Sequence, residues 1–166
     1  MAKKKTVKKT IKKIKKGKRG FTLVELLVVV AIIGLMAAVA LVALNSARMK
    51  ARDARRVADI RQVQTALEMY YMDANIYPSG TLLIGTTSGA GSCLDNAGWT
   101  ATCGGTIYMA RTPSNPAPTD DGTCGSAVSY YYTQKASGAS YTIGYCLGAT
   151  TGALPGGVRE ATPGGL

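Results

Sequence analysis

Residues 21–44 read FTLVELLVVVAIIGLMAAVALVAL, and this stretch decides the fold. Within it, residues 26–44 form a run of nineteen without a side chain that carries charge or forms hydrogen bonds. As an α-helix rising ~1.5 Å per residue, the run would span about 28 Å, close to the ~30 Å hydrocarbon thickness of a bilayer. A buried core helix is the alternative, but core helices are seldom apolar on every face for this length. The run therefore predicts a membrane-inserted helix.

The charges on either side of the run predict its orientation. Residues 1–20 hold ten Lys, one Arg and no acidic residue, which equals the whole net charge of +11. Residues 48–61 hold six basic and two acidic side chains, a net charge of +4. Because the more positive flank stays in the cytoplasm, the chain after Leu44 is expected to be exported.

The composition excludes several classes of function. The residues after Gly20 hold nine basic and nine acidic side chains, so binding to nucleic acid is not indicated, although the arginines of residues 48–61 leave it open. The absence of His excludes His-based triads, His metal ligands and a His proton switch. No G-x-S-x-G motif and no phosphate-binding loop occurs either. We therefore expect neither an enzyme nor a cofactor.

Glu25 does not fit an ordinary membrane anchor. It lies at the start of the apolar run, and a carboxylate deep in a bilayer costs about 2.5–3.5 kcal/mol on insertion scales. No Lys or Arg lies between Glu25 and Arg48, and the nearest basic residues on the other side are Lys18 and Arg19. The carboxylate is therefore expected to lie near an interface, to be protonated, or to find a cationic partner.

The pattern of residues 14–78 resembles the class III signal of type IV pilins and type II secretion pseudopilins. The resemblance rests on a basic leader ending in Gly20, on the segment FTLVE at residues 21–25, and on the apolar helix that follows. It implies that a prepilin peptidase cuts between Gly20 and Phe21, that Phe21 is then N-methylated, and that Glu25 acts in filament assembly. Many members of the family have a proline where this chain has Val42, so the resemblance does not predict a helix kink at that point.

Cleavage would supply the cation that Glu25 lacks, because it creates an α-amino group at Phe21 and removes the leader charges. The resemblance implies that the carboxylate contacts the amine of a neighbouring subunit. Such pairing relieves the cost of an unpaired carboxylate in a helical bundle and would favour one axial stagger between subunits. Gly34 and Ala38 form a small-x-x-x-small pair that would let helices approach closely, although alanine is also simply common in helices.

A different export route is also open. Residues 38–40 read Ala-Val-Ala, an A-x-A pattern after a basic and apolar stretch, as in an ordinary secretory signal. Cleavage after Ala40 would release a secreted soluble binding protein. Against this, Glu25 interrupts the start of the apolar segment, and the apolar run continues past the cut to Leu44.

The helical pattern continues through residues 46–75, so one helix is expected from about Phe21 to about Ala74, ended by Asn75 and Pro78. Apolar residues follow one stripe of this second half: Ala47, Ala51, Ala54, Val57, Ala58, Ile60, Val63, Leu67, Tyr70 and Tyr71. The pairs Asp53–Arg56 and Arg55–Asp59 are assigned to the opposite, solvated side, where each is worth a few tenths of a kcal/mol. The arginines of residues 48–61 could contact anionic lipid headgroups or simply form a solvated face.

The remainder, residues 76–166, is rich in Gly, Ser, Thr and Tyr and predicts a small antiparallel sheet. One face of the sheet would pack on the helical stripe and the other would face water, with most tyrosines in the core. A hairpin loop at residues 135–139 would place Gly138 in the left-handed region. The expected strands are residues 106–110, 127–134, 140–147 and 157–162. The predicted fold class is thus α+β and pilin-like, with a leader (1–20), a transmembrane or filament-core helix (21–45), an amphipathic half (46–75) and a β domain (76–166).

Four cysteines lie in the portion expected to be exported, and they permit three pairings. We favour Cys93–Cys103, which closes a Gly-rich loop of little periodicity, and Cys124–Cys146, which ties a strand to its approach. A zinc site built from all four is the competing interpretation, weakened by the absence of a C-x-x-C pair. Asp120 and Asp121 most simply form a turn, and we assign them no calcium site.

These observations and the resemblance imply a structural subunit of a type IV pilus or a related filament. The expected partners are further copies of the chain, a prepilin peptidase, an inner-membrane assembly platform, and membrane lipid before assembly. A major pseudopilin of a type II secretion system is the nearest alternative, since residues 75–78 resemble the end signal of that class, whereas the cysteine-bearing half resembles pilins.

Overall fold

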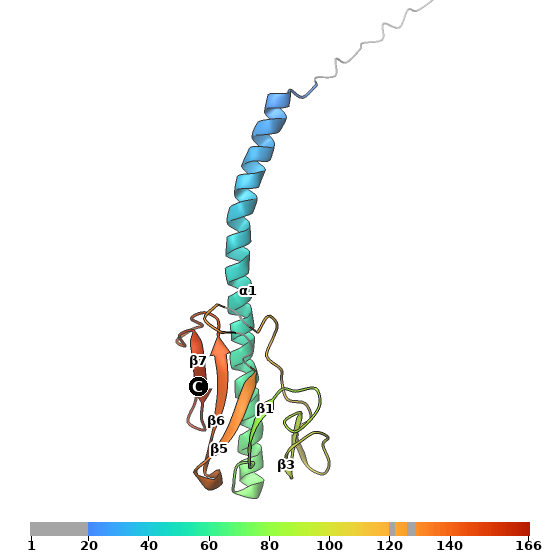
Figure 1. Ribbon diagram of the computed structural model, residues 1–166, viewed down its shortest axis with the longest axis vertical. Helices are drawn as coiled ribbons and strands as arrows, with labels where there is room; N and C mark the ends of the chain where they lie inside the picture. The colour runs from blue at the N-terminus through green and yellow to red at the C-terminus, as the bar shows by residue number, and fades with distance from the viewer. Residues whose placement is uncertain (1–19, 120–121, 126–128) are drawn as a thin grey trace, which may run out of the picture. The chain divides into compact units, whose positions relative to one another are not determined.

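The computed structural model describes residues 20–119, 122–125 and 129–166 (Figure 1). The chain divides into two compact units, one ending at Ala40 and the other comprising Leu41–Leu166. The elements in order are α1 (Leu23–Ala74), β1 (Thr81–Ile84), β2 (Cys93–Asp95), β3 (Gly98–Thr100), β4 (Ile107–Met109), β5 (Tyr130–Lys135), the 3-10 turn η1 (Ala136–Gly138), β6 (Ser140–Leu147) and β7 (Gly157–Ala161).

The first unit contains most of the apolar run of α1, and the described residues leave it uncovered. Every residue from Gly20 to Ala40 is exposed, with Phe21 at 84% and Leu35 at 71% of their full accessible area. By length and composition, α1 is a helix that could cross a membrane. Apolar exposure on this scale requires a membrane or a partner to cover it.

The C-terminal end of α1 lies where the sequence predicts it. Asn75 adopts a positive φ of 55°, and its N–H donates to the Tyr71 carbonyl at 2.8 Å. A residue in the left-handed region after the last turn is a common helix stop, and asparagine tolerates that conformation better than most residues. The helix therefore ends at Ala74, before Pro78.

A four-stranded antiparallel sheet, in the order β1-β5-β6-β7, covers the amphipathic half of α1 (Figure 1). Alternate side chains of β6 are buried against the helix, and the same alternation in β5 buries Tyr130 and Tyr132 and exposes Tyr131. The core joins the two layers and includes Ile60, Val63, Leu67, Tyr70, Ile84, Tyr130, Tyr132, Tyr141, Ile143, Tyr145, Leu147 and Ala161. The α+β, pilin-like arrangement expected from the sequence is thus confirmed, with one sheet face on the helix.

The four predicted strands are recovered with small differences at their ends. Strand β6 matches residues 140–147, and β4 and β7 lie inside the predicted ranges. Strand β5 begins at Tyr130, and residues 127–128 of the predicted strand lie outside the described part of the chain. In the connector, Gly138 has φ +95° as expected, but Ala136 and Ser137 also have positive φ, at 49° and 51°. The loop therefore has three successive residues with positive φ, where the sequence predicted one.

The segment 79–105 is more regular than its sequence indicates. It forms β1 on the edge of the main sheet, and β2 and β3 in a second antiparallel sheet of order β3-β2-β4. These strands have three or four residues each, too short to show an alternation of apolar and polar residues. Leu94 of β2 is fully buried, and Trp99 of β3 packs edge-on against Tyr132 with ring centroids 5.2 Å apart.

Tyrosines form much of the core, and the hydroxyls of Tyr77 and Tyr132 donate to acceptors at its edge. Tyr77 packs edge-on against Tyr141 at 4.7 Å between centroids, and its hydroxyl donates to the Glu68 carboxylate at 3.0 Å. The Tyr132 hydroxyl donates to the Pro78 carbonyl at 2.6 Å. Burial, followed by the hydrogen bond to Glu68, raises the pKa of Tyr77 to about 12, and burial also raises the pKa of Tyr132 and Tyr141.

These shifts predict a loss of stability in strong alkali. A phenol whose pKa is raised on folding stabilises the native state below its unfolded pKa of 10.0, and this contribution disappears as pH rises through the folded value of about 12. We expect the free energy of unfolding of the full chain in detergent to fall steeply over this pH range, coincident with tyrosinate absorbance. Tyr77→Phe should reduce the steepness of that fall. An unfolding free energy that stays constant up to the folded pKa of Tyr77 would contradict this assignment.

Candidate functional site

The residues of the predicted cleavage and assembly motif lie at the N-terminal end of α1. The Thr22 carbonyl accepts the first helical hydrogen bond, from the Leu26 N–H at 3.2 Å, so Thr22 is the N-cap residue. Gly20 and Phe21 precede the helix and are exposed. A Cβ at Gly20 would meet no atom within 4 Å, so packing does not require glycine there.

Thr22 and Glu25 form a capping box. The Thr22 N–H and hydroxyl each donate to Glu25 Oε2 at 2.8 Å, and the Glu25 N–H donates to the Thr22 hydroxyl at 3.2 Å. The sequence analysis missed this role, although a threonine followed three residues later by a glutamate just before an apolar run is its usual signature. Glu25 therefore has an uncharged partner in its own chain, while its Oε1 accepts no hydrogen bond from the described residues.

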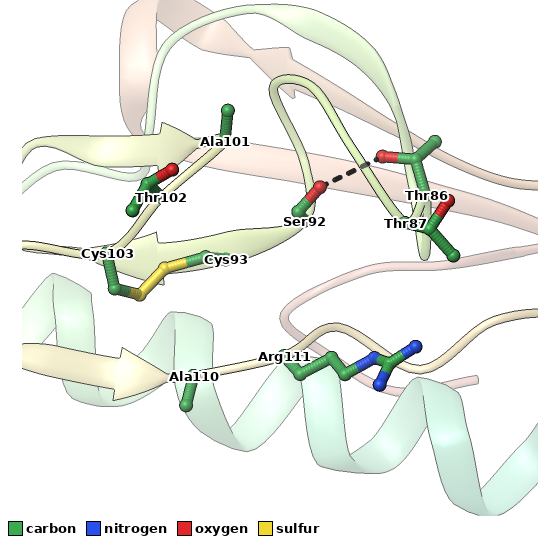
Figure 2. A pocket seen from close by; sticks show the side chains of 9 residues that line it. All are labelled: Thr86, Thr87, Ser92, Cys93, Ala101, Thr102, Cys103, Ala110 and Arg111. Atoms are coloured by element: carbon green, nitrogen blue, oxygen red, sulfur yellow. Dashed lines mark hydrogen bonds between the residues drawn. A yellow bond between two sulfur atoms is a disulfide. The ribbon is translucent and has the colours of Figure 1, made fainter.

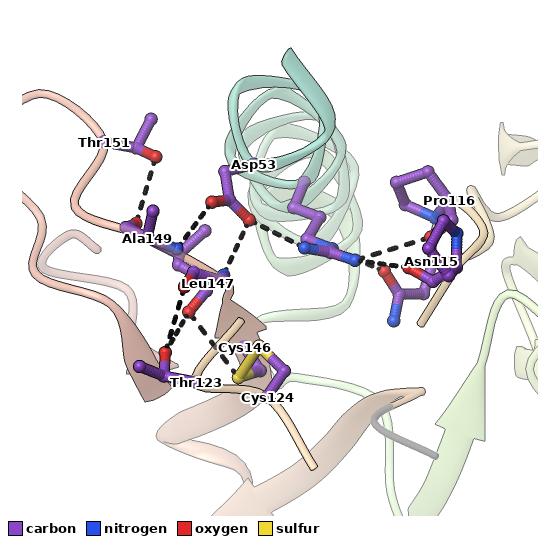
Figure 3. Close-up of a disulfide and its surroundings, with 12 residues drawn as sticks. Asp53, Asn115, Pro116, Thr123, Cys124, Cys146, Leu147, Ala149 and Thr151 are labelled. Atoms are coloured by element: carbon purple, nitrogen blue, oxygen red, sulfur yellow. Dashed lines mark hydrogen bonds and ion pairs between the residues drawn. A yellow bond between two sulfur atoms is a disulfide. The ribbon is translucent and has the colours of Figure 1, made fainter. Parts of the chain in front are cut away.

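Asp53 and Arg56 are a buried ion pair, which corrects their assignment to a solvated helix face. Both side chains are fully buried, and Arg56 Nη1 lies 2.7 Å from Asp53 Oδ1. The error arose because helical spacing shows that two residues share a face without showing what covers that face. Here the loops around Pro116 and Ala149 cover it (Figure 3).

Each partner of the pair also holds a loop. Asp53 accepts hydrogen bonds from the Gly148 N–H and the Ala149 N–H, both at 2.9 Å. Arg56 donates to Asn115 Oδ1 at 2.8 Å and to the Pro118 carbonyl at 3.1 Å. The buried charges are thus compensated on both sides, which is the condition under which burial of an ion pair is tolerated. The pair connects α1 to the chain on either side of β5 and β6.

The Cys124–Cys146 disulfide lies beside the Asp53 contacts (Figure 3). Thr123, next to Cys124, donates its hydroxyl to the Leu147 carbonyl at 2.9 Å, so the approach to the sheet runs along the end of β6. The other disulfide joins Cys93 to Cys103. Both pairs are the ones favoured in the sequence analysis. All four sulfurs are used, which leaves no thiolate for the competing zinc site.

A shallow hollow of about 400 Å³ lies beside Cys93–Cys103 (Figure 2). Its lining is mostly hydroxyl groups and alanines, and the hydroxyls of Thr86 and Ser92 share a hydrogen bond at 3.3 Å. Asp95, which lies close to the two sulfurs, uses one oxygen for the Ala97 N–H and the other for the Gly104 N–H. This group is therefore a turn closed by a disulfide and presents no free metal ligands.

The second predicted helix pair, Arg55–Asp59, differs from the first. Asp59 is half-buried and accepts a hydrogen bond from the Tyr130 hydroxyl at 3.0 Å, while Arg55 is exposed. Burial raises the pKa of the Asp59 carboxyl, and the Tyr130 hydrogen bond and the Arg55 charge partly oppose this. Asp59 thus links the helix to β5. Asp120 and Asp121, considered for calcium, lie outside the described residues.

Comparison with known proteins identifies the N-terminal segment. Residues 15–41 match the family model of the prokaryotic N-terminal methylation motif. This chain carries the class III signal of type IV pilins and pseudopilins. Proteins with this pilin-type motif are structural subunits rather than enzymes, and the motif with its apolar helix fits a membrane-anchored precursor. No curated protein and no solved structure matches the chain.

The match covers the residues that the sequence analysis selected for processing and assembly, Gly20, Phe21 and Glu25, and also the small pair Gly34 and Ala38. The structure adds Thr22 as the residue that positions the Glu25 carboxylate. It places the buried pair Asp53–Arg56 outside the matched segment, so the methylation motif and the internal ion pair are separate features of the pilin-like chain.

The buried pair predicts a large and asymmetric effect of mutation. Asp53→Ala leaves the Arg56 charge without its counter-ion and the Gly148 and Ala149 N–H groups without their acceptor. We therefore expect a loss of about 3–5 kcal/mol in unfolding free energy. Replacing both residues together, as Asp53→Leu with Arg56→Met, should cost less than the two single changes combined. The measurement is urea unfolding of the full chain in detergent. Arg55→Ala on the exposed side is the control and should change stability by roughly 0.5 kcal/mol or less; a similar loss in all variants would contradict the prediction.

Proposed function

We propose that the chain is a structural subunit of a type IV pilus or a closely related filament, which is processed by a prepilin peptidase and polymerised through α1. In this proposal residues 1–20 are a removable leader, 21–45 the membrane and filament-core helix, 46–75 its amphipathic half and 76–166 the displayed β domain. Before assembly the helix is held in the inner membrane, with its N-terminus cytoplasmic, and an assembly platform in that membrane receives the processed subunit.

The observation that carries the proposal is the complete exposure of an apolar helix bearing the methylation motif. A soluble binding protein released after Ala40 would discard much of that helix, and its new end would lie inside α1, which continues through Ala40 without interruption. A filament subunit instead uses the same surface twice, first against lipid and then against other helices. Gly34 supports the second use. A Cβ there would meet nothing within 4 Å, so packing within the chain does not require glycine, whereas close approach of another helix would.

The processing chemistry converts a tethered leader into a charged chain end. Hydrolysis adds one water across the Gly20–Phe21 peptide bond, leaving a carboxylate on Gly20 and an amine on Phe21. Methylation then replaces one proton on that nitrogen with a methyl group from a methyl donor, and the methylated amine remains a base that is protonated at neutral pH. Each subunit thereby gains one cation at the end of its apolar helix.

The capping box explains how Glu25 can meet that cation. Oε2 is held by Thr22, which fixes the carboxylate at the helix end, and Oε1 remains available to a donor from outside the described chain. We propose that the Phe21 amine of a neighbouring subunit takes this place. Pairing in the low-dielectric helical bundle then favours the one axial stagger at which amine and carboxylate coincide.

One prediction of the proposed function concerns the mature N-terminus. Filaments purified from the cell surface should contain chains that begin at methylated Phe21, because cleavage is needed to create the amine. Intact-mass and peptide mass spectrometry measure this directly. Chains that begin at Leu41, or filaments that retain the lysine-rich leader, would contradict the proposal. Imaging of the same preparation separates a long surface pilus from a short secretion pseudopilus.

Another prediction separates the charge of Glu25 from its capping role. Glu25→Gln keeps a side chain that can complete the capping box but removes the charge, and Thr22→Ala keeps the charge but removes the cap. We expect Glu25→Gln to insert into the membrane and to be cleaved, yet to yield at least tenfold fewer filaments, about the effect of one lost ion pair worth 1.4 kcal/mol. Thr22→Ala should assemble more fully than Glu25→Gln.

Filament yield by electron microscopy and membrane content by immunoblot give the two readouts. Normal assembly of Glu25→Gln would show that the charge has no part in register. Equal defects in both variants would assign the effect to the helix cap instead.

A further inference from the structure

A basic hollow lies on the helix just beyond the apolar run. It has a volume of about 460 Å³. Its lining comes from one stretch of α1 and from one loop residue: Asn45, Ser46, Arg48, Met49, Arg52 and Pro118. Arg48 is exposed and makes no ion pair or side-chain hydrogen bond with the described residues, whereas Arg52 already has a contact within the chain. The Arg48 guanidinium is therefore the group in the hollow that is available to donate hydrogen bonds to a ligand.

The hollow begins where the membrane span ends. Asn45 directly follows Leu44, the last residue of the apolar run. At ~1.5 Å of rise per residue, Arg48 lies about 6 Å beyond Leu44, which is within the headgroup layer of roughly 5–7 Å on each side of a bilayer. The Cα–Cβ bonds of a helix are tilted toward its N-terminus, so the Arg48 side chain starts out toward the end of the apolar run.

The charge of this region runs against the usual bias of exported flanks. Positively charged residues close to a span favour the cytoplasmic side, yet residues 48–61 hold six basic side chains against two acidic ones. Part of this excess is neutralised internally, since Arg56 is buried against Asp53. Arg48 and Lys50 remain exposed within two turns of Leu44. The exposed Arg48 therefore places a positive charge on the outer side of the span, where an anionic ligand would neutralise it.

We propose that the hollow at residues 45–52 binds the phosphate of an anionic phospholipid headgroup in the outward-facing leaflet. This inference rests on the proposed function, because it requires α1 to be membrane-inserted before assembly. The phosphate oxygens accept charge-assisted hydrogen bonds from Arg48, and further bonds from the Ser46 hydroxyl and the Asn45 amide. The half-buried Met49 supplies an apolar wall for the glycerol and upper acyl carbons of the lipid. A lipid fits this combination better than a free anion does, because the hollow adjoins the apolar span.

The test is photolabelling of the full chain in vesicles. A phosphatidylglycerol with a photoreactive group in its headgroup is compared with a phosphatidylcholine that carries the same group, and labelled peptides are mapped by mass spectrometry. We expect phosphatidylglycerol to label the peptide that contains residues 45–52, and Arg48→Gln to reduce that labelling about fivefold, which corresponds to ~1 kcal/mol for one basic residue at an anionic surface.

Two further variants separate the hollow from diffuse charge and from misfolding. Lys50→Gln removes the same charge from an exposed residue that does not line the hollow, and it should change labelling less than twofold. Ser46→Trp keeps every charge but fills the hollow, and it should reduce labelling as Arg48→Gln does. The basic leader is present in every variant, so its own attraction to lipid cancels in the comparison.

Several results would overturn the assignment. They are equal labelling by the two lipids, equal loss in Lys50→Gln and Arg48→Gln, or labelling that is abolished by excess inorganic phosphate, which would make the ligand a free anion. If labelling is unaffected by Arg48→Gln while the chain is still cleaved and assembled, only the lipid inference fails. If the chain is extracted from membranes by carbonate, the proposed function fails with it.

Discussion

The apolar half of α1 is the constraint from which the other features of the chain follow. Every residue from Gly20 to Ala40 is exposed within its own chain, and nearly all of them are apolar. Water cannot be the stable surroundings of such a helix, because apolar area left in water costs roughly 25 cal/mol per Å². In the proposed function the helix exchanges one apolar environment for another, and charged groups near its two ends, Glu25 and Arg48 among them, can direct that exchange.

Glu25 illustrates how one side chain can serve both environments. In the single chain its Oε2 accepts from the Thr22 N–H, and the Thr22 hydroxyl accepts from the Glu25 N–H, so two donors at the start of α1 have partners within the chain. The remaining oxygen gives the carboxylate a fixed direction for a second partner. A carboxylate on a freely rotating side chain would lose more conformational entropy on pairing than one already held by a cap. Local capping and assembly therefore support each other.

The sequence predicts those parts of the chain whose periodicity is long enough to show what lies on each face. The helix, its end at Asn75, the strands β6 and β7 and the tyrosine core are of this kind. The burial of Asp53 and Arg56 could not be predicted, because it depends on loops that reach them from 59 to 96 residues away in sequence. Strands β1, β2 and β3 were missed for the opposite reason, since three or four residues carry too little pattern.

The capping box was missed although its signature is local, because Glu25 had already been assigned a different role. Both roles draw on the same electrostatic fact, that a carboxylate near helix-terminal N–H groups is stabilised there. The two ends of the apolar run then differ in the origin of their partners. In the proposed function, the cation for Glu25 arises only when the peptide bond after Gly20 is cut, whereas the anion proposed for Arg48 is present in any membrane with acidic lipid. Under these two proposals the subunit would be held by lipid at one end before processing and would gain a partner for its carboxylate at the other end afterwards, which would give assembly a direction.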